Sequence, residues 1–140
     1  MTINSSHQGQ PVLLDTNFLL LPFQKRIDVF GEIPKLLQTQ VCLLVIPQIL
    51  EELRWLAKNG ASRESRAAQS AIKALNRFTS IVTDIPSTIR HLDADNALIQ
   101  YAQRIGAIVA TNDRELRLKL VSQGSRVIYL RKLAVLAITE

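Results

Sequence analysis

The sequence predicts an α/β fold: a three-layer α/β/α sandwich around a five-stranded, mostly parallel sheet. Short apolar runs alternate along the chain with segments in which apolar residues recur at helical spacing. The runs are continuously apolar, as is typical of parallel strands that are buried on both faces. Gly106 and Gly124 separate some of these segments as expected of turn residues.

Five apolar runs are expected to form the strands. They cover residues 11–15, 41–46, 80–83, 107–110 and 126–130. Ligands of such folds bind at the carboxyl ends of the strands. Residues that directly follow these runs are therefore candidates for a functional site.

Helices are expected between the strands. Asn17 begins a short helix that Pro22 should stop, and Pro34 should interrupt the next helix, residues 27–37. The further helices are expected over residues 47–59, 63–78, 93–105 and 112–122. Asn112, with Glu115 three residues later, predicts a capping box for the last of them. The C-terminal residues show no clear pattern.

The composition predicts one globular domain. The chain has 140 residues, of which 47% are hydrophobic and 21% charged. We expect a polar tail over residues 1–10 and a single domain over residues 11–140. The start of the chain lacks the features of a signal peptide, and no apolar run approaches the roughly 20 residues that cross a bilayer. Cys42 is the only cysteine, so an internal disulfide is excluded. These features predict a cytoplasmic protein that does not associate with membranes.

The charge distribution favours a polyanionic partner. The formal net charge is +5. Arg63 and Arg66 share one helical face with further basic residues, and Arg114 and Arg117 follow the last acidic motif. All four are candidate substrate-binding residues. A solvated helix face is the simpler interpretation of the Arg63 stripe, and it stays open for Arg114.

The seven aromatic residues do not form an evident platform for stacking nucleic-acid bases. Trp55 and Tyr101 lie at core spacing and are expected to pack in the interior.

Four acidic residues stand where the chain leaves a strand or enters a helix: Asp15, Glu52, Asp95 and Asp113. The predicted fold would bring them to one edge of the sheet, where they repel one another unless a cation lies among them. Hard cations such as Mg²⁺ and Mn²⁺ take oxygen ligands. The four acids therefore predict a metal site suited to phosphoryl transfer or phosphodiester hydrolysis.

Each acid also has an ordinary structural interpretation. Asp15 could cap the turn after the first strand, although a carboxylate that ends a buried strand is costly without a partner. Glu52, like its neighbour Glu51, could be an exposed helix acid. Asp95 and Asp113 could favour a helix dipole in a first turn. Only the combination favours a site.

The motifs that contain these acids resemble the PIN domain family of Mg²⁺/Mn²⁺-dependent ribonucleases. The similar segments are Asp15-Thr16-Asn17, residues 47–53, Asp95-Asn96-Ala97-Leu98, residues 110–116 and residues 127–131. The resemblance implies the same α/β/α sandwich. It implies that the four acids bind the metal and catalyse the reaction, and that Thr16, Asn17, Thr111 and Asn112 support them by hydrogen bonds.

The implied reaction is endonucleolytic cleavage of RNA. A metal-activated water, held by the four carboxylates, would attack phosphorus and leave a 5′-phosphate and a 3′-hydroxyl. Many members carry a second acid where this chain has Asn96, so the number of metal ions stays open. The resemblance extends to a ribosomal-RNA-processing branch and to toxins that an antitoxin protein blocks, and it implies a homodimer.

Other classes fit less well. A haloacid-dehalogenase-type phosphatase would need an acid at Asn17, a receiver domain would need an acidic pair after the first strand, and a Rossmann or P-loop protein would need a glycine-rich loop there. The remaining alternative is a PIN-like module that binds RNA or protein in a larger assembly without catalysis.

Overall fold

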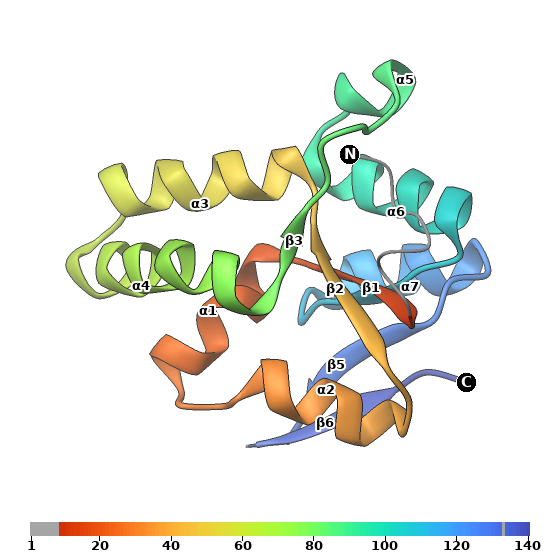
Figure 1. The fold of residues 1–140 in the computed structure, drawn as a ribbon, viewed down its shortest axis with the longest axis horizontal. Helices are drawn as coiled ribbons and strands as arrows, with labels where there is room; N and C mark the ends of the chain where they lie inside the picture. Colours follow the sequence, from red (N-terminus) through yellow and green to blue (C-terminus); the bar gives the residue numbers. More distant parts are fainter. Residues whose placement is uncertain (1–8, 133) are drawn as a thin grey trace.

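The protein, described by a computed structural model over residues 9–132 and 134–140, is built around one sheet (Figure 1). Within these residues the sheet has six strands: β1 (Gln10–Leu14), β2 (Val41–Val45), β3 (Ser80–Ile81), β4 (Ile108–Ala110), β5 (Val127–Arg131) and β6 (Val135–Ile138). Their order is β3-β2-β1-β4-β5-β6. Most of the predicted N-terminal tail lies outside the described residues.

Strands β1 to β5 are parallel, and β6 runs antiparallel to β5. The α/β class with a mostly parallel sheet is confirmed, but the described sheet has one strand more than the five expected. The extra strand gives a weak sequence signal because only Leu136 of its four residues is buried, while Val135 is 53% exposed.

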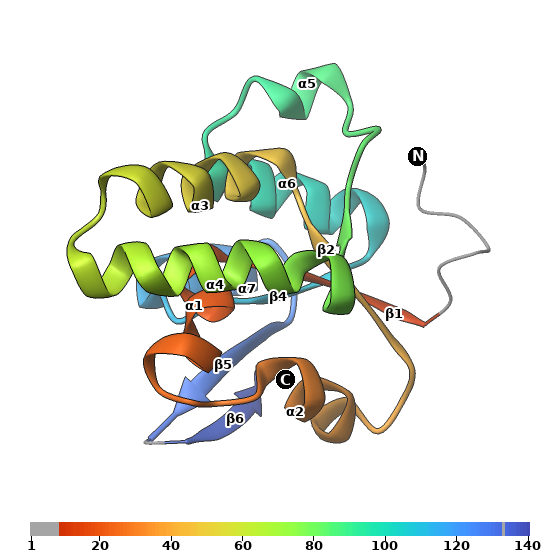
Figure 2. The same ribbon diagram turned by 60° about the vertical axis from the view of Figure 1, so that its left-hand side comes forward.

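Helices lie on both sides of the sheet (Figure 2). They are α1 (Thr16–Gln24), α2 (Val29–Leu37), α3 (Pro47–Asn59), α4 (Ser62–Phe78), α5 (Ser87–Arg90), α6 (Ala94–Ile105) and α7 (Arg114–Ser122). Helix α6 packs on β1 and β4, and α7 packs on β5, whereas α2 contacts β2 and β6 and α1 packs against α4. Helices α3 and α4 form an antiparallel hairpin (Figure 1). None of the helices in the described ranges is long and apolar enough to cross a bilayer.

The predictions that Pro22 stops a helix and that Pro34 interrupts one are wrong. Pro22 lies inside α1 and Pro34 inside α2, and neither stops nor divides its helix. Each proline removes one backbone hydrogen bond and strains its helix by about 3 kcal/mol. The full burial of Phe18, Leu19 and Ile33 opposes this cost, since each buried side chain of this size contributes roughly 1.5–3 kcal/mol.

The core determines where a ligand can bind. Buried side chains of β1, β2 and β4 fill the space between the two helical layers. The chain moves outward in opposite directions from β1 and from β4, which are neighbours in the sheet. Such a reversal of strand order leaves a crevice at the carboxyl ends of the two strands. Asp15 directly follows β1, and Thr111 directly follows β4.

Candidate functional site

Asp15 is the centre of a polar cluster at this crevice. It caps the N-terminus of α1 and is only 6% exposed. Its Oδ1 accepts a hydrogen bond from the Thr16 N–H at 2.8 Å. Its Oδ2 accepts one from the Thr111 hydroxyl at 2.6 Å and one from the Asn17 amide at 3.2 Å. Both carboxylate oxygens are therefore held in fixed orientations by neighbouring donors.

Further hydrogen bonds join the ends of three strands around Asp15. The Thr111 hydroxyl oxygen accepts from the Asp113 N–H at 3.1 Å. The Asn17 Oδ1 accepts from the Asn112 N–H at 2.9 Å, and the Asn112 Oδ1 accepts from the Leu130 N–H at 2.8 Å. The residues that follow β1 and β4 thus form one network with the end of β5.

The expected capping box of α7 is wrong in its details. The N-cap is Asp113, whose Oδ1 accepts a hydrogen bond from the Leu116 N–H at 3.1 Å. Asn112 is free for this reason to bond β5 instead. One carboxylate oxygen of Asp113 therefore has a structural task at the helix start.

Electrostatic repulsion connects the four predicted acids. Burial raises the pKa of Asp15 to about 6; hydrogen bonds from Thr111 and Thr16 oppose this rise, and repulsion by Glu52 and Asp95 adds to it. Burial also raises the pKa of Asp95, with further contributions from Asp113, Asp93 and Glu52 and a partial offset from Lys119. Asp15 and Asp95 therefore each feel the charge of Glu52, and Asp95 also that of Asp113.

No basic residue neutralises this cluster by direct pairing within residues 9–132 and 134–140. The ion pairs described there join Lys35 to Glu32, Arg90 to Glu51 and Lys119 to Glu115. A set of carboxylates without nitrogen or sulfur donors fits a hard divalent cation in its chemistry. In the same residues, however, no three acidic, histidine or cysteine side chains converge closely enough to hold a metal ion as they stand.

The positions of the four acids explain why their chemistry suits a cation while their present arrangement does not hold one. Asp15 is fixed by its hydrogen bonds, Asp95 is half-buried, and Glu52 and Asp113 are exposed on or beside the starts of helices. Exposed side chains such as those of Glu52 and Asp113 can change rotamer at low cost.

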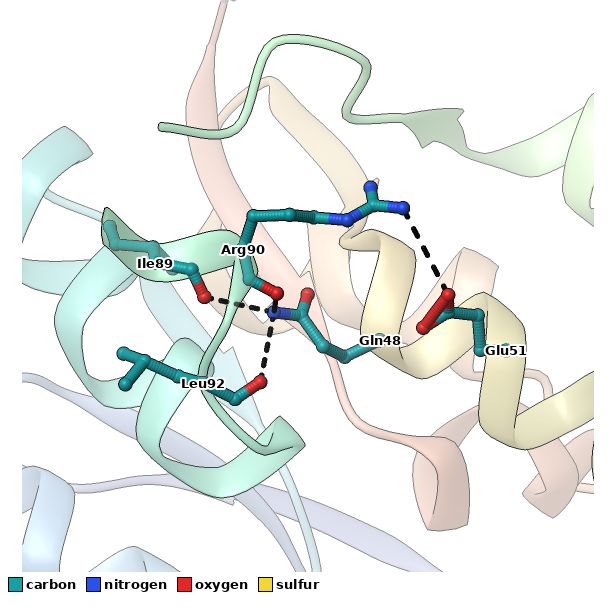
Figure 3. A network of polar contacts seen from close by, with 5 residues as sticks. All are labelled: Gln48, Glu51, Ile89, Arg90 and Leu92. Carbon is teal, nitrogen blue, oxygen red and sulfur yellow. Dashed lines mark hydrogen bonds and ion pairs between the residues drawn. The ribbon is translucent and has the colours of Figure 1, made fainter. Parts of the chain in front are cut away.

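The structure also distinguishes Glu52 from its neighbour Glu51. Glu51 points to Arg90, with 3.9 Å between carboxylate oxygen and guanidinium nitrogen (Figure 3). Glu52 instead raises the pKa of both Asp15 and Asp95. Glu51 is therefore engaged with Arg90, whereas Glu52 stays the predicted site acid of α3.

Gln48 is a residue of this region that the sequence did not indicate. Its Nε2 donates to the carbonyl oxygens of Ile89, Arg90 and Leu92 at 3.0, 3.3 and 3.2 Å (Figure 3). These bonds fasten the segment that leads into α6 to the first turn of α3. Helix α6 contains Asp95, and α3 contains Glu52. We found no signal for this role in the sequence beyond a polar residue after Pro47.

The predicted substrate-binding arginines lie in two places. Arg114 is exposed beside Asp113, and the Arg117 guanidinium lies over the Tyr129 ring at 4.1 Å from its centroid. Arg63 and Arg66 lie on α4, in a separate cleft with Phe23.

The expectation for Trp55 is wrong. Its side chain is 60% exposed on α3, whereas Tyr101 is only 4% exposed, as expected. Helical spacing alone does not distinguish the two because α3 exposes the face that contains Trp55.

Comparison with known proteins is consistent with this fold. The profile of the PIN-like domain matches residues 12–133. The chain belongs to this family. Ribonuclease VapC4 of Methanocaldococcus jannaschii is 31% identical over 124 residues, which cover 86% of this chain and 90% of that protein. Ribonuclease VapC9 of Archaeoglobus fulgidus is 29% identical over 120 residues, covering 86% of this chain and 82% of that protein.

Solved structures share the fold. The PIN domain endonuclease Utp24 superimposes with a TM-score of 0.71 at 22% identity, covering 91% of this chain and 90% of that one. VapBC2 from Rickettsia felis, bound to a DNA fragment from its promoter, gives a TM-score of 0.64 at 14% identity, covering 87% of this chain and 100% of the matched chain.

Proposed function

We propose that this protein is a metal-dependent endoribonuclease that hydrolyses phosphodiester bonds of RNA. The observation that carries the proposal is the buried carboxylate of Asp15, which Glu52 and Asp95 repel and which forms no ion pair in the described part of the chain. Two relatives that are named ribonucleases support the assignment.

In this proposal Asp15, Glu52, Asp95 and Asp113 hold Mg²⁺ or Mn²⁺. When bound, the ion makes water nucleophilic at neutral pH and offsets charge on the phosphate. The chain's own contribution is orientation. Thr111, Asn17 and the Thr16 N–H hold Asp15 in place, and Asn112 ties the turn before α7 to β5.

Substrate contacts near the bond that is cleaved are assigned to Arg114 and Arg117. Both lie in the first turns of α7, adjacent to Asp113. Phosphate contacts from such residues provide affinity and orientation without reading sequence. Arg117 is already oriented by its contact with Tyr129, so it loses less conformational freedom when it binds a phosphate.

The partners follow the same proposal. The likeness to VapC proteins and to a VapBC complex supports an antitoxin that covers the acidic crevice, and we propose a cytoplasmic homodimer. A role in ribosomal-RNA processing is the alternative within the nuclease class.

A non-catalytic PIN-like module is the second candidate. The observation in its favour is that no three potential ligands converge in the described residues. Such a module would bind RNA or protein with the same affinity whether or not Asp15 can ionise.

Thermal unfolding and RNA cleavage with Mn²⁺ test the two candidates together. We expect Mn²⁺ to raise the melting temperature of the wild-type protein, since a ligand that binds only the folded state stabilises it. Asp15→Asn should abolish both this shift and the cleavage of a single-stranded RNA. Glu32→Gln, which removes one exposed acid on α2, is the matched control and should retain both. Intact RNA with every preparation, together with RNA binding that survives Asp15→Asn, would favour the binding module.

A further inference from the structure

A cationic cleft lies about one length of α1 away from the acidic crevice. It is a cleft of about 660 Å³ between the turn that ends α1 and the first half of α4. Lys25 and Arg26 line it from the turn, and Arg63 and Arg66 from the helix. Figure 2 shows the end of α1 beneath α4, and the two helices pack against each other. Four positive charges from separate segments therefore face one small volume.

These cations have no internal partners in the described part of the chain. None of the four side chains takes part in a hydrogen bond or an ion pair there, and no acidic residue lines the cleft. Like charges that are gathered without counter-ions repel one another. The arrangement is therefore favourable when an anion occupies the cleft.

The backbone of the turn provides a second and independent observation. Arg26 has φ 56, in the left-handed region. The N–H groups of Lys25 and Ile27 both donate to the Leu21 carbonyl, at 2.9 and 3.5 Å, which is a common way to end a helix. Glycine usually occupies the left-handed position because a Cβ is strained there. An arginine at this position sacrifices stability and places a cation at the mouth of the cleft.

The cleft lies within reach of a nucleic-acid strand that occupies the acidic crevice. Helix α1 begins directly after Asp15 and has nine residues, so the turn lies roughly 14 Å further along its axis. This corresponds to roughly four nucleotides of a stacked strand at 3.4 Å each. Phe23, which is 39% exposed, lines the same cleft and offers a face on which a base can stack.

We propose that this cleft binds the phosphate backbone of an RNA strand a few nucleotides away from the bond that is cleaved. The inference rests on the proposed function, because it takes RNA as the ligand of the acidic crevice. It adds Lys25 and Arg26 to the substrate-binding surface and gives Arg63 and Arg66 a common ligand. The contacts are to phosphates, so the cleft lengthens the bound segment without selecting its sequence.

Fluorescence anisotropy of a short labelled single-stranded RNA, titrated with protein in EDTA, tests the inference without cleavage. The variant is Lys25→Gln/Arg26→Gly, which removes two charges and relieves the left-handed position. We expect weaker RNA binding together with an unchanged or higher melting temperature. The slope of log affinity against log salt should fall by about 1.4, since each phosphate contact to a single strand contributes about 0.7.

The matched control is Arg104→Gln/Arg126→Gln, which also removes two positive charges. These two residues lie near the edge of the sheet where the parallel strands begin. Arg104 lies in the last turn of α6, and Arg126 directly precedes β5. This control should bind RNA with the wild-type salt dependence. A second test variant, Arg63→Gln/Arg66→Gln, keeps good helix formers on α4 and should weaken binding as the first one does.

The possible outcomes separate this inference from the nuclease proposal. RNA cleavage by the wild-type protein, with unchanged RNA binding by both cleft variants, overturns the inference and leaves the nuclease intact. Binding that is weakened only in the cleft variants, by a protein that leaves RNA uncleaved with Mn²⁺, supports the cleft and overturns catalysis. If polyglutamate displaces the RNA equally well per charge, and only when the cleft is intact, the cleft is assigned to an acidic protein segment instead.

Discussion

Replacing Asp15 by asparagine should stabilise the metal-free protein at neutral pH. Burial, with repulsion from Glu52 and Asp95, raises the pKa of this carboxyl from 3.8 to about 6. The folded state therefore binds more protons than the unfolded state between these values, and stability falls as the pH rises from about 4 to about 6. The shift corresponds to roughly 3 kcal/mol that the ionised carboxylate costs above pH 6.

Asparagine removes that cost but loses part of the hydrogen bonding. Its amide nitrogen cannot accept. If the carbonyl oxygen takes the place of Oδ2, it keeps the bonds from Thr111 and Asn17, and the Thr16 N–H must find another acceptor, at a cost of about 1–2 kcal/mol. The net gain at pH 7.5 should be roughly 1–2 kcal/mol. For a chain of this size the melting temperature should rise by roughly 3–10 °C.

Circular dichroism melting curves in EDTA, at pH 7.5 and at pH 4.5, measure the effect. At pH 4.5 the folded wild-type protein holds Asp15 largely protonated, so the advantage of Asp15→Asn should vanish. Glu32→Gln should show no such pH-dependent gain because it changes an exposed acid. Equal destabilisation by Asp15→Asn at both pH values would refute the argument from burial and repulsion.

Three further substitutions, the last with a matched control, probe the network around Asp15, the loop before α6 and the core. Thr111→Val removes the hydroxyl that donates to the buried carboxylate; we expect a loss of about 1–3 kcal/mol in urea unfolding and a further rise of the carboxyl pKa in an NMR titration, whereas an unchanged pKa would contradict the hydrogen bond. Gln48→Ala should accelerate amide hydrogen exchange at residues 87–92 before other segments respond, because it removes the amide that three carbonyls share. Leu13→Ala should cost about 2–5 kcal/mol of unfolding free energy through the cavity that it leaves, while Leu118→Ala, at a position that is 59% exposed, should change the value little.

The sequence predicts the centre of the sheet well for a physical reason. The runs that become β1, β2 and β4 are continuously apolar because both faces of these strands are buried, and no competing pattern fits them. The position of the four acids follows from the same regularity, since the ends of parallel strands share one edge. Asp15 and Asp95 influence each other's region electrostatically, but the meeting of all four acids stays a prediction, since no three of them converge in the described residues.

The features that the sequence misses depend on contacts between distant segments. Pro22 and Pro34 remain inside helices because burial outweighs local propensity. The role of Gln48 depends on carbonyls about 40 positions later in the chain, which no local pattern encodes. The cationic cleft joins residues 23–26 to residues 63–70, so a charge pattern along one helix reveals only half of it.

The two outer strands of the sheet have a consequence for self-association. In the described residues, β3 spans two residues and β6 spans four, and they form the two borders of the sheet. Borders this short offer few free backbone groups for pairing with another chain, which protects the protein against strand-mediated aggregation. A homodimer held by side-chain contacts, in place of pairing between sheets, leaves the hydrogen bonding of the sheet unchanged.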